Sequence, residues 1–191
     1  PRIWALPDEV RNRYDLSSLQ IVFHMAAPMP PWLKEKWIEW LGPERIYELY
    51  GGTEAQGATI ISGVEWLEHR GSVGKIAETA RLRIIGEDGT EVATGETGEI
   101  YFLPNDGAGC TYHYLGAEPK RRADGWESLG DIGRLDADGY VTITGRWKDV
   151  IIRGGENVPV VEIENVLYRH PAVRQVAIVA MPDARLGERA C

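Results

Sequence analysis

Cysteine, positive charge and long apolar runs are all scarce in this sequence. Its two cysteines, Cys110 and Cys191, lie far apart and form neither a disulfide framework nor a zinc pattern, so we expect a reducing, cytoplasmic setting. The formal net charge of -8 argues against a nucleic-acid partner, because such partners are held by clustered Lys and Arg. No apolar run approaches the ~20 residues that cross a bilayer, so we expect no membrane span.

The composition is that of a folded globular protein. Hydrophobic residues make up 43% and charged residues 26% of the 191 positions, close to average values, and this length allows one domain or two. The chain begins with Pro1 and ends at Cys191 straight after a polar turn, so we expect an internal piece of a longer protein. The sequence leaves the oligomeric state open.

The first fifty residues predict two strands around one helix. Residues 20–25 (QIVFHM) form an apolar run with β-branched members and are predicted to be a strand that enters a loop. Two prolines at 30 and 31 favour a helix start, apolar residues then recur at helical spacing, and the Gly-Pro pair at 42–43 ends the helix. The helix tryptophans are expected to pack rather than to bind a cofactor. Residues 45–50 (RIYELY) are the second strand.

Residues 75–145 are predicted to be rich in antiparallel strands. Short runs at 81–85 (RLRII), 90–93 (TEVA) and 99–103 (EIYFL) are separated by turn signals. A further hairpin is predicted between 133–136 and 140–144, because the Asp-Gly pair between them suits a turn with positive φ.

A different pattern begins at Asp149. An apolar strand (VIIR) leads to Gly154 and Gly155, a helix opened by Pro159 follows, and residues 173–181 are predicted to be a strand. This is the pattern of a β-α-β unit, in which backbone amides of the glycine pair could approach a ligand at the helix start. The boundary between the two regions is predicted near residues 146–149.

Three polar loops have residue types suited to a nucleotide. The YGGTE loop (50–54) offers a ring to stack on a base, open backbone, a hydroxyl, and a carboxylate for Mg²⁺, which prefers oxygen ligands. The SLGD loop (128–131) offers a carboxylate that could accept hydrogen bonds from a ribose diol, and GRWKD (145–149) adds two cations. Each loop alone is more often an ordinary turn, so their order along the chain carries the argument.

That order resembles one family. The segments MAAP (25–28), YGGTE (50–54), GSVGKI (71–76), GEIYF (98–102), GWESLGDIGRLDADGYVTITGR (125–146) and WKDVIIRGGENVPVVEIE (147–164) resemble the second half of the adenylate-forming superfamily. This superfamily includes acyl-CoA synthetases, firefly luciferase and the adenylation domains of peptide synthetases. The resemblance implies a mixed α/β (α+β) fold. Residues 1–146 would be the C-terminal portion of the large AMP-binding domain, and residues 147–191 the start of a small, mobile α+β C-terminal domain.

The resemblance also implies roles for single residues around ATP. Tyr50 would stack on adenine beside Gly51 and Gly52, Thr53 would touch the α-phosphate, and Glu54 would hold Mg²⁺. Asp131 would take both ribose hydroxyls, and Arg146 would bind ribose or phosphate oxygens.

Other positions are implied to serve the acid and CoA. Ala26 and Ala27, with the Gly51-Gly52 pair, would line the acyl pocket, although Met25 stands where the family usually has Gly. Lys148 would be the hinge about which the C-terminal domain pivots between acyl-AMP formation and transfer to CoA. For the second step, the loop with Gly154, Gly155, Glu156 and Asn157 would help form the pantetheine channel.

The function implied is that of an ATP-dependent acid-CoA ligase acting on a fatty, bile or other bulky carboxylic acid. An adenylation domain that loads a carrier protein is an alternative, and a non-catalytic β-rich module, for example one binding calcium at residues 136–139, is another. The family's phosphate loop and its downstream lysine are not in this sequence. We therefore expect the 191-residue chain alone not to form acyl-AMP.

Overall fold

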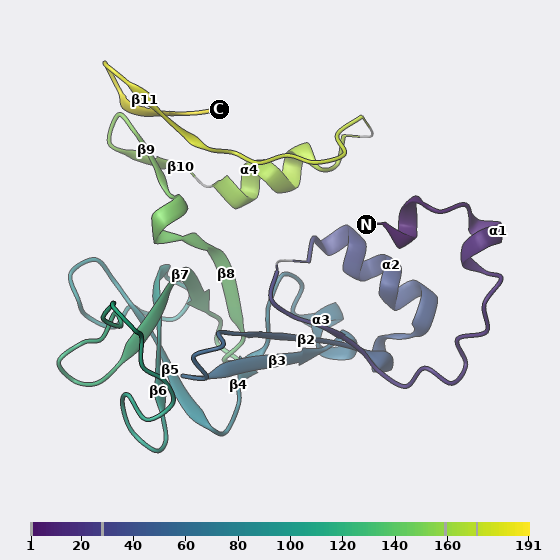
Figure 1. Ribbon diagram of the computed structural model, residues 1–191, viewed down its shortest axis with the longest axis horizontal. Coiled ribbons are helices and arrows are strands. Elements are labelled where there is room, and N and C mark those ends of the chain that lie inside the picture. Colours follow the sequence, from purple (N-terminus) through teal and green to yellow (C-terminus); the bar gives the residue numbers. More distant parts are fainter. Residues whose placement is uncertain (1, 28, 159, 171) are drawn as a thin grey trace.

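The computed structural model describes residues 2–27, 29–158, 160–170 and 172–191, which form a mixed α/β fold (Figure 1). These residues form three four-stranded sheets, two of which lie together while the third stands apart with the C-terminus. The N-terminal stretch contributes only the short helices η1 (Ile3–Ala5) and α1 (Asp8–Arg11). In the described residues the longest helix has 11 residues, and none is long and apolar enough to cross a membrane.

The first sheet confirms the strand-helix-strand prediction. Its strands, in order, are β1 (Val22–His24), β2 (Ile46–Gly51), β3 (Ala58–Ser62) and β4 (Lys75–Ile76). The first two strands are parallel and the other pairings are antiparallel. The connecting helix α2 (Pro31–Leu41) starts at a proline and ends at Gly42, whose φ of 87° a residue with a side chain rarely adopts, and η2 (Pro43–Arg45) then leads into β2.

The core of this half lies between α2 and the sheet. Ile38 and Leu41 of α2 pack with Ile46, Ile61 and Trp66, the last from helix α3 (Gly63–Glu68). The helix tryptophans pack as predicted, because Trp37 and Trp40 lie against this core and against the ring of Trp4.

The second sheet is the predicted antiparallel region. Its strands run in the order β5 (Ala80–Ile85), β6 (Gly98–Pro104), β7 (Glu127–Leu135) and β8 (Val141–Arg146). The predicted hairpin is confirmed between β7 and β8, where Gly139 has a φ of 82° and Asp136 Oδ1 accepts backbone N–H groups of Asp138 and Tyr140. The strand predicted at 90–93 is wrong. One isolated bridge, between Glu91 and Ile85, forms in its place.

The β-α-β unit predicted after Asp149 is confirmed in its first strand and its helix, but the predicted connection between them is wrong. Following η3 (Trp147–Asp149), the glycine pair joins two antiparallel strands, β9 (Ile151–Arg153) and β10 (Glu156–Val158). Gly154 and Gly155 have φ values of 62° and 91°, which suit a tight hairpin turn, so the chain folds back instead of entering a helix.

The rest of the third sheet also differs from the prediction. Helix α4 (Val160–Leu167) forms where a helix was expected, but Pro159, its predicted opener, lies outside the described residues. The predicted strand at 173–181 is mostly irregular. Strand pairing starts only at β11 (Ala180–Asp183), which runs antiparallel to β12 (Gly187–Ala190). The strand order of this third sheet is β10-β9-β12-β11. Gly187, at a φ of 79°, opens this last hairpin.

Candidate functional site

Three residues predicted to bind the nucleotide meet at one point. The Tyr50 hydroxyl donates to Asp131 Oδ2 at 2.8 Å, and Arg146 Nε donates to Asp131 Oδ1 at 2.6 Å. Tyr50 lies near the end of β2, whereas Asp131 and Arg146 face each other across β7 and β8. The two larger sheets therefore bring together side chains that are 81 residues apart.

The electrostatics of this cluster keep each member ready to hydrogen-bond. Burial, reinforced by the charge of Asp131, raises the pKa of Tyr50 above its usual range, so the phenol stays a neutral donor. The hydrogen bond with Asp131 raises the pKa of Arg146, which stays charged. Asp131 is only 4% exposed, but a carboxylate has about four acceptor sites and two are in use. It can still accept two hydroxyl groups, as a ribose diol requires.

The neighbouring acid, Glu54, has a different setting. Its Oε1 accepts a hydrogen bond from the Tyr114 hydroxyl at 2.8 Å, and its Oε2 lies 3.4 Å from Thr53 Oγ1. The bond from Tyr114 is the main cause that lowers the pKa of Glu54, and the charge of Arg146 contributes in the same direction. An ionised carboxylate beside a hydroxyl is a donor set that fits a hard cation such as Mg²⁺.

Neighbouring atoms leave little room for a side chain at Gly51 or Gly52. A Cβ at Gly52 would lie 2.5 Å from Glu54 Oε2 and 2.9 Å from Leu129 Cδ1, and a Cβ at Gly51 would lie 2.9 Å from the Gly57 carbonyl oxygen. A side chain at Gly51 would displace backbone, whereas one at Gly52 would require the Glu54 and Leu129 side chains to move. Gly52 thus leaves room for the Glu54 carboxylate.

The residues predicted to serve the acid are placed near this loop by topology. Ala26 and Ala27 follow β1 and are exposed, and Ala26 adopts a φ of 70°, which is uncommon for a residue with a Cβ. Because β1 and β2 are parallel, their carboxyl ends, and so the Ala26-Ala27 and Gly51-Gly52 loops, lie at one edge of the sheet. Pro28, the last residue of that motif, lies outside the described residues.

The residues predicted to serve CoA lie in the third sheet. Lys148 is in η3, two residues after Arg146, while Gly154, Gly155, Glu156 and Asn157 belong to the β9–β10 hairpin. Within the described ranges, no hydrogen bond joins this hairpin to the Tyr50–Asp131–Arg146 cluster. One residue of each, Arg146 and Asn157, lines a cavity of about 410 Å³ that Tyr50 and Asp131 do not line.

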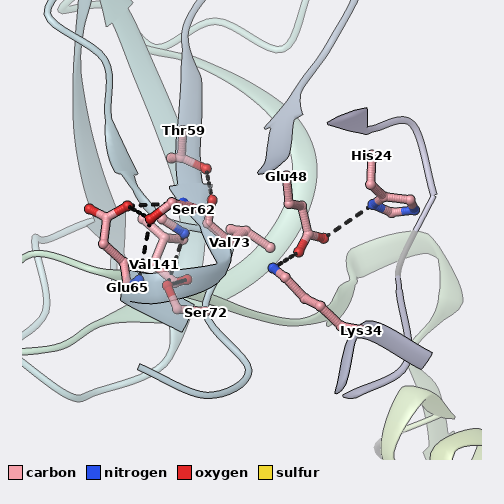
Figure 2. Close-up of polar contacts among 10 residues, drawn as sticks. His24, Lys34, Glu48, Thr59, Ser62, Glu65, Ser72, Val73 and Val141 are labelled. Atoms are coloured by element: carbon pink, nitrogen blue, oxygen red, sulfur yellow. Dashed lines mark hydrogen bonds and ion pairs between the residues drawn. The ribbon is translucent and has the colours of Figure 1, made fainter. Parts of the chain in front are cut away.

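A buried charge network beneath these loops was not predicted. Lys34 Nζ donates to Glu48 Oε2 at 2.5 Å, and His24 Nδ1 lies 3.5 Å from Glu48 Oε1 (Figure 2). Burial lowers the pKa of Lys34. Burial alone would raise the pKa of Glu48, but His24 and Lys34 outweigh it and lower the pKa overall. The network joins α2 to the two strands that lead into the loops.

Neither the Lys34–Glu48 ion pair nor the Tyr114–Glu54 hydrogen bond was predicted, and the two differ in the sequence signal that could have indicated them. Lys34 lies four positions before Ile38 and seven before Leu41, so it falls on the apolar stripe of the helix, where a lysine needs a buried partner. Tyr114 lies in an irregular stretch with no periodicity, and nothing in the sequence pairs it with Glu54. In the alternative calcium loop, Asp136 Oδ1 serves the turn of its hairpin, while Oδ2 faces His69 Nδ1 at 3.2 Å. Asp136, Asp138 and His69 lie close enough together to hold a metal ion, but a histidine in the set does not match the all-oxygen ligands that calcium prefers.

Known proteins similar to this chain identify its family. The family model described as AMP-binding enzyme matches residues 2–109, and its C-terminal domain model matches residues 162–191. Indoleacetate–CoA ligase of Aromatoleum aromaticum is 35% identical over 91% of this chain and 34% of its own length. A medium/long-chain-fatty-acid–CoA ligase of Mycobacterium tuberculosis is 36% identical over 91% of this chain and 31% of its own.

A solved structure extends the comparison to ligands. The o-succinylbenzoate–CoA synthetase of Bacillus subtilis, in complex with ATP and a magnesium ion, matches with a TM-score of 0.75 and 29% identity, over 89% of this chain and 35% of that one. This chain thus spans about a third of the length of the relatives it matches. It belongs to the AMP-binding enzyme family, among the adenylate-forming acid–CoA ligases.

Proposed function

We propose that this chain is part of an enzyme that uses ATP to activate a carboxylic acid as an acyl-adenylate and then transfers the acyl group to CoA. The observation that supports it most is the meeting of Tyr50, Asp131 and Arg146 at one point in a chain of this family. An aromatic ring, a carboxylate with free acceptor sites and a guanidinium match a base, a ribose diol and a phosphate.

Each residue of the cluster then has a role toward the nucleotide. The ring of Tyr50 would lie against adenine, Asp131 would accept both ribose hydroxyls, and Arg146 would bind ribose or phosphate oxygens. Thr53 would donate to the α-phosphate, and Glu54 would hold Mg²⁺. When bound, the metal neutralises phosphate charge and orients the oxygens.

The chemistry needs positioning and charge more than covalent help from the protein. The acid's carboxylate attacks the α-phosphorus, the bond to the bridging oxygen breaks, and pyrophosphate leaves with that electron pair. Arg146 and Thr53 are the groups of this chain that would stabilise charge on the α-phosphate. In the second step the CoA sulfur, having lost its proton, attacks the acyl carbon, and AMP leaves.

The second step is the proposed task of the region after Arg146. We assign residues 1–146 to the large domain and 147–191 to the start of a mobile domain, with Lys148 as the hinge. The β9–β10 hairpin, including Gly154 to Asn157, would move toward the acyl group and line the pantetheine channel. The shared cavity between Arg146 and Asn157 supports this pairing.

The acid and the compartment are finer proposals. The acid is of fatty or similarly bulky type, supported by the small Ala26 and Ala27 beside the loop and by a fatty-acid–CoA ligase among the relatives. CoA is favoured over a carrier protein because the relatives are named as CoA ligases. Exposed free thiols at Cys110 and Cys191 support a reducing, cytoplasmic location.

The test is ATP–pyrophosphate exchange with the complete enzyme and a panel of carboxylic acids of increasing chain length. We expect exchange that depends on the acid and Mg²⁺, and thioester formation when CoA is added. The isolated 191-residue chain, used as the control, is expected to show neither. No exchange by the complete enzyme with any acid would contradict the proposal. Exchange by the isolated chain would contradict only the expectation that this chain alone does not form acyl-AMP.

A further inference from the structure

An irregular segment between β6 and β7 reaches back to the loop that carries Glu54. Gln56 Nε2 donates to the Tyr112 hydroxyl at 3.0 Å, and the Tyr114 hydroxyl donates to Glu54 Oε1 at 2.8 Å. The hydroxyls of Tyr112 and Tyr114 therefore contact Gln56 and Glu54, respectively, and the residues of each pair are two positions apart in the chain. The tyrosine rings also pack edge to face, with centroids 5.0 Å apart.

The base of this segment is fixed by a buried acid. Glu127 is fully buried, and its Oε1 accepts hydrogen bonds from Arg121 Nε at 2.6 Å and from the Gly109 backbone N–H at 3.0 Å. Its Oε2 accepts from Gln56 Nε2 at 3.1 Å, and Gln56 is itself only 1% exposed. The network holds both ends of the segment and Gln56, so the segment is attached to the loop independently of Tyr114.

Tyr114 differs from the rest of this network in its exposure and its partner. Its side chain is 41% exposed, so its hydroxyl is not needed to satisfy a buried group. Its partner Oε1 belongs to the acid assigned to the metal, while Oε2 accepts only a long hydrogen bond, of 3.4 Å, from the Thr53 hydroxyl. The shorter bond from Tyr114 therefore does most to decide which oxygen of this partly buried carboxylate faces Thr53.

We propose that Tyr114 is a positioning residue, which holds Oε1 of Glu54 so that Oε2 faces the metal ion bound with ATP. The inference rests on the proposed function, because it assigns Glu54 to Mg²⁺. Partners that orient a metal ligand through a hydrogen bond affect metal affinity strongly, although they do not touch the ion.

The test compares Tyr114→Phe with Tyr112→Phe in the complete enzyme. Each variant loses one hydroxyl and keeps the ring packing, and Mn²⁺ titration of the ATP complex, followed by electron paramagnetic resonance, reports metal affinity without turnover. We expect Tyr114→Phe to weaken Mn²⁺ binding about tenfold, with the affinity for metal-free ATP unchanged. Tyr112→Phe should remain within about twofold of the wild type, because Gln56 keeps its bond to Glu127.

Three results would count against the inference. Wild-type Mn²⁺ affinity in a folded Tyr114→Phe variant would overturn it and leave the proposed function standing. Equal losses in both variants would also overturn it, because they would indicate a general effect of the segment. A wild-type enzyme that binds no metal with ATP would overturn the proposed function, and this inference with it.

Discussion

The chain before and after Arg146 differs in how its side chains are packed. In the two larger sheets, almost every residue of β6 is buried, and Ile100 and Phe102 are fully enclosed. Among the described residues after Ile151, by contrast, none is buried, and Val166 on α4 is 58% exposed. Within the described residues, the third sheet is held by its hairpins rather than by a core.

The polar interactions of the two regions differ in the same way. Lys34 and Glu48 form an ion pair that is almost wholly removed from water, so each charge depends on the other. After Arg146 the side-chain hydrogen bonds are exposed or only partly buried, such as those from the backbone N–H groups of Ile152 to Glu188 and of Ile178 to Glu164. Substitutions in the first region should therefore affect the free energy of unfolding, whereas those in the second should affect the reaction.

The largest effect is expected from Lys34→Met. Removing the lysine leaves Glu48 buried without its cation, which should lower the free energy of unfolding by roughly 3–5 kcal/mol. Chemical denaturation measures this change. Val166→Ala, an exposed apolar position on α4, is the matched control and should cost about 0.5 kcal/mol or less. A loss near that of the control would mean that the ion pair does not stabilise the first region.

Lys148→Pro tests the second region. A proline fixes φ and should stiffen η3, so the complete enzyme is expected to keep acyl-adenylate formation while thioester formation falls roughly 100-fold. Single-turnover assays of the two half-reactions measure each separately. Equal loss of both half-reactions would contradict the hinge and would indicate that both regions are needed for both steps.

Sequence reasoning succeeded where local signals decide the structure. The helix 31–41 and the β7–β8 hairpin follow from Pro31, Gly42 and the Asp138-Gly139 turn, which act on their immediate neighbours. It failed at Gly154-Gly155, because a glycine pair suits a hairpin as well as a helix start, and the pairing of β9 with β12 is not visible locally.

The site shows the same limit. Tyr50, Asp131 and Arg146 could be named because their motifs stand in the family's order, but the hydrogen bonds that join them depend on two sheets meeting. Tyr114 and the Lys34–Glu48 pair could not be paired from sequence, since each contact joins residues with no shared periodicity. Contacts between distant segments are what the fold adds.

If Asp131 is the centre of a nucleotide site, its charge should determine the affinity for ATP, which calorimetric titration of ATP into the complete enzyme measures. Asp131→Asn keeps the shape of the side chain but removes the charge that accepts from Tyr50, Arg146 and the ribose diol. This variant should bind ATP at least about tenfold more weakly, the value of one hydrogen bond to a charged group. Asp124→Asn, at an exposed acid paired only with Arg122, should bind ATP as the wild type does. Unchanged affinity in a folded Asp131→Asn enzyme would contradict the account.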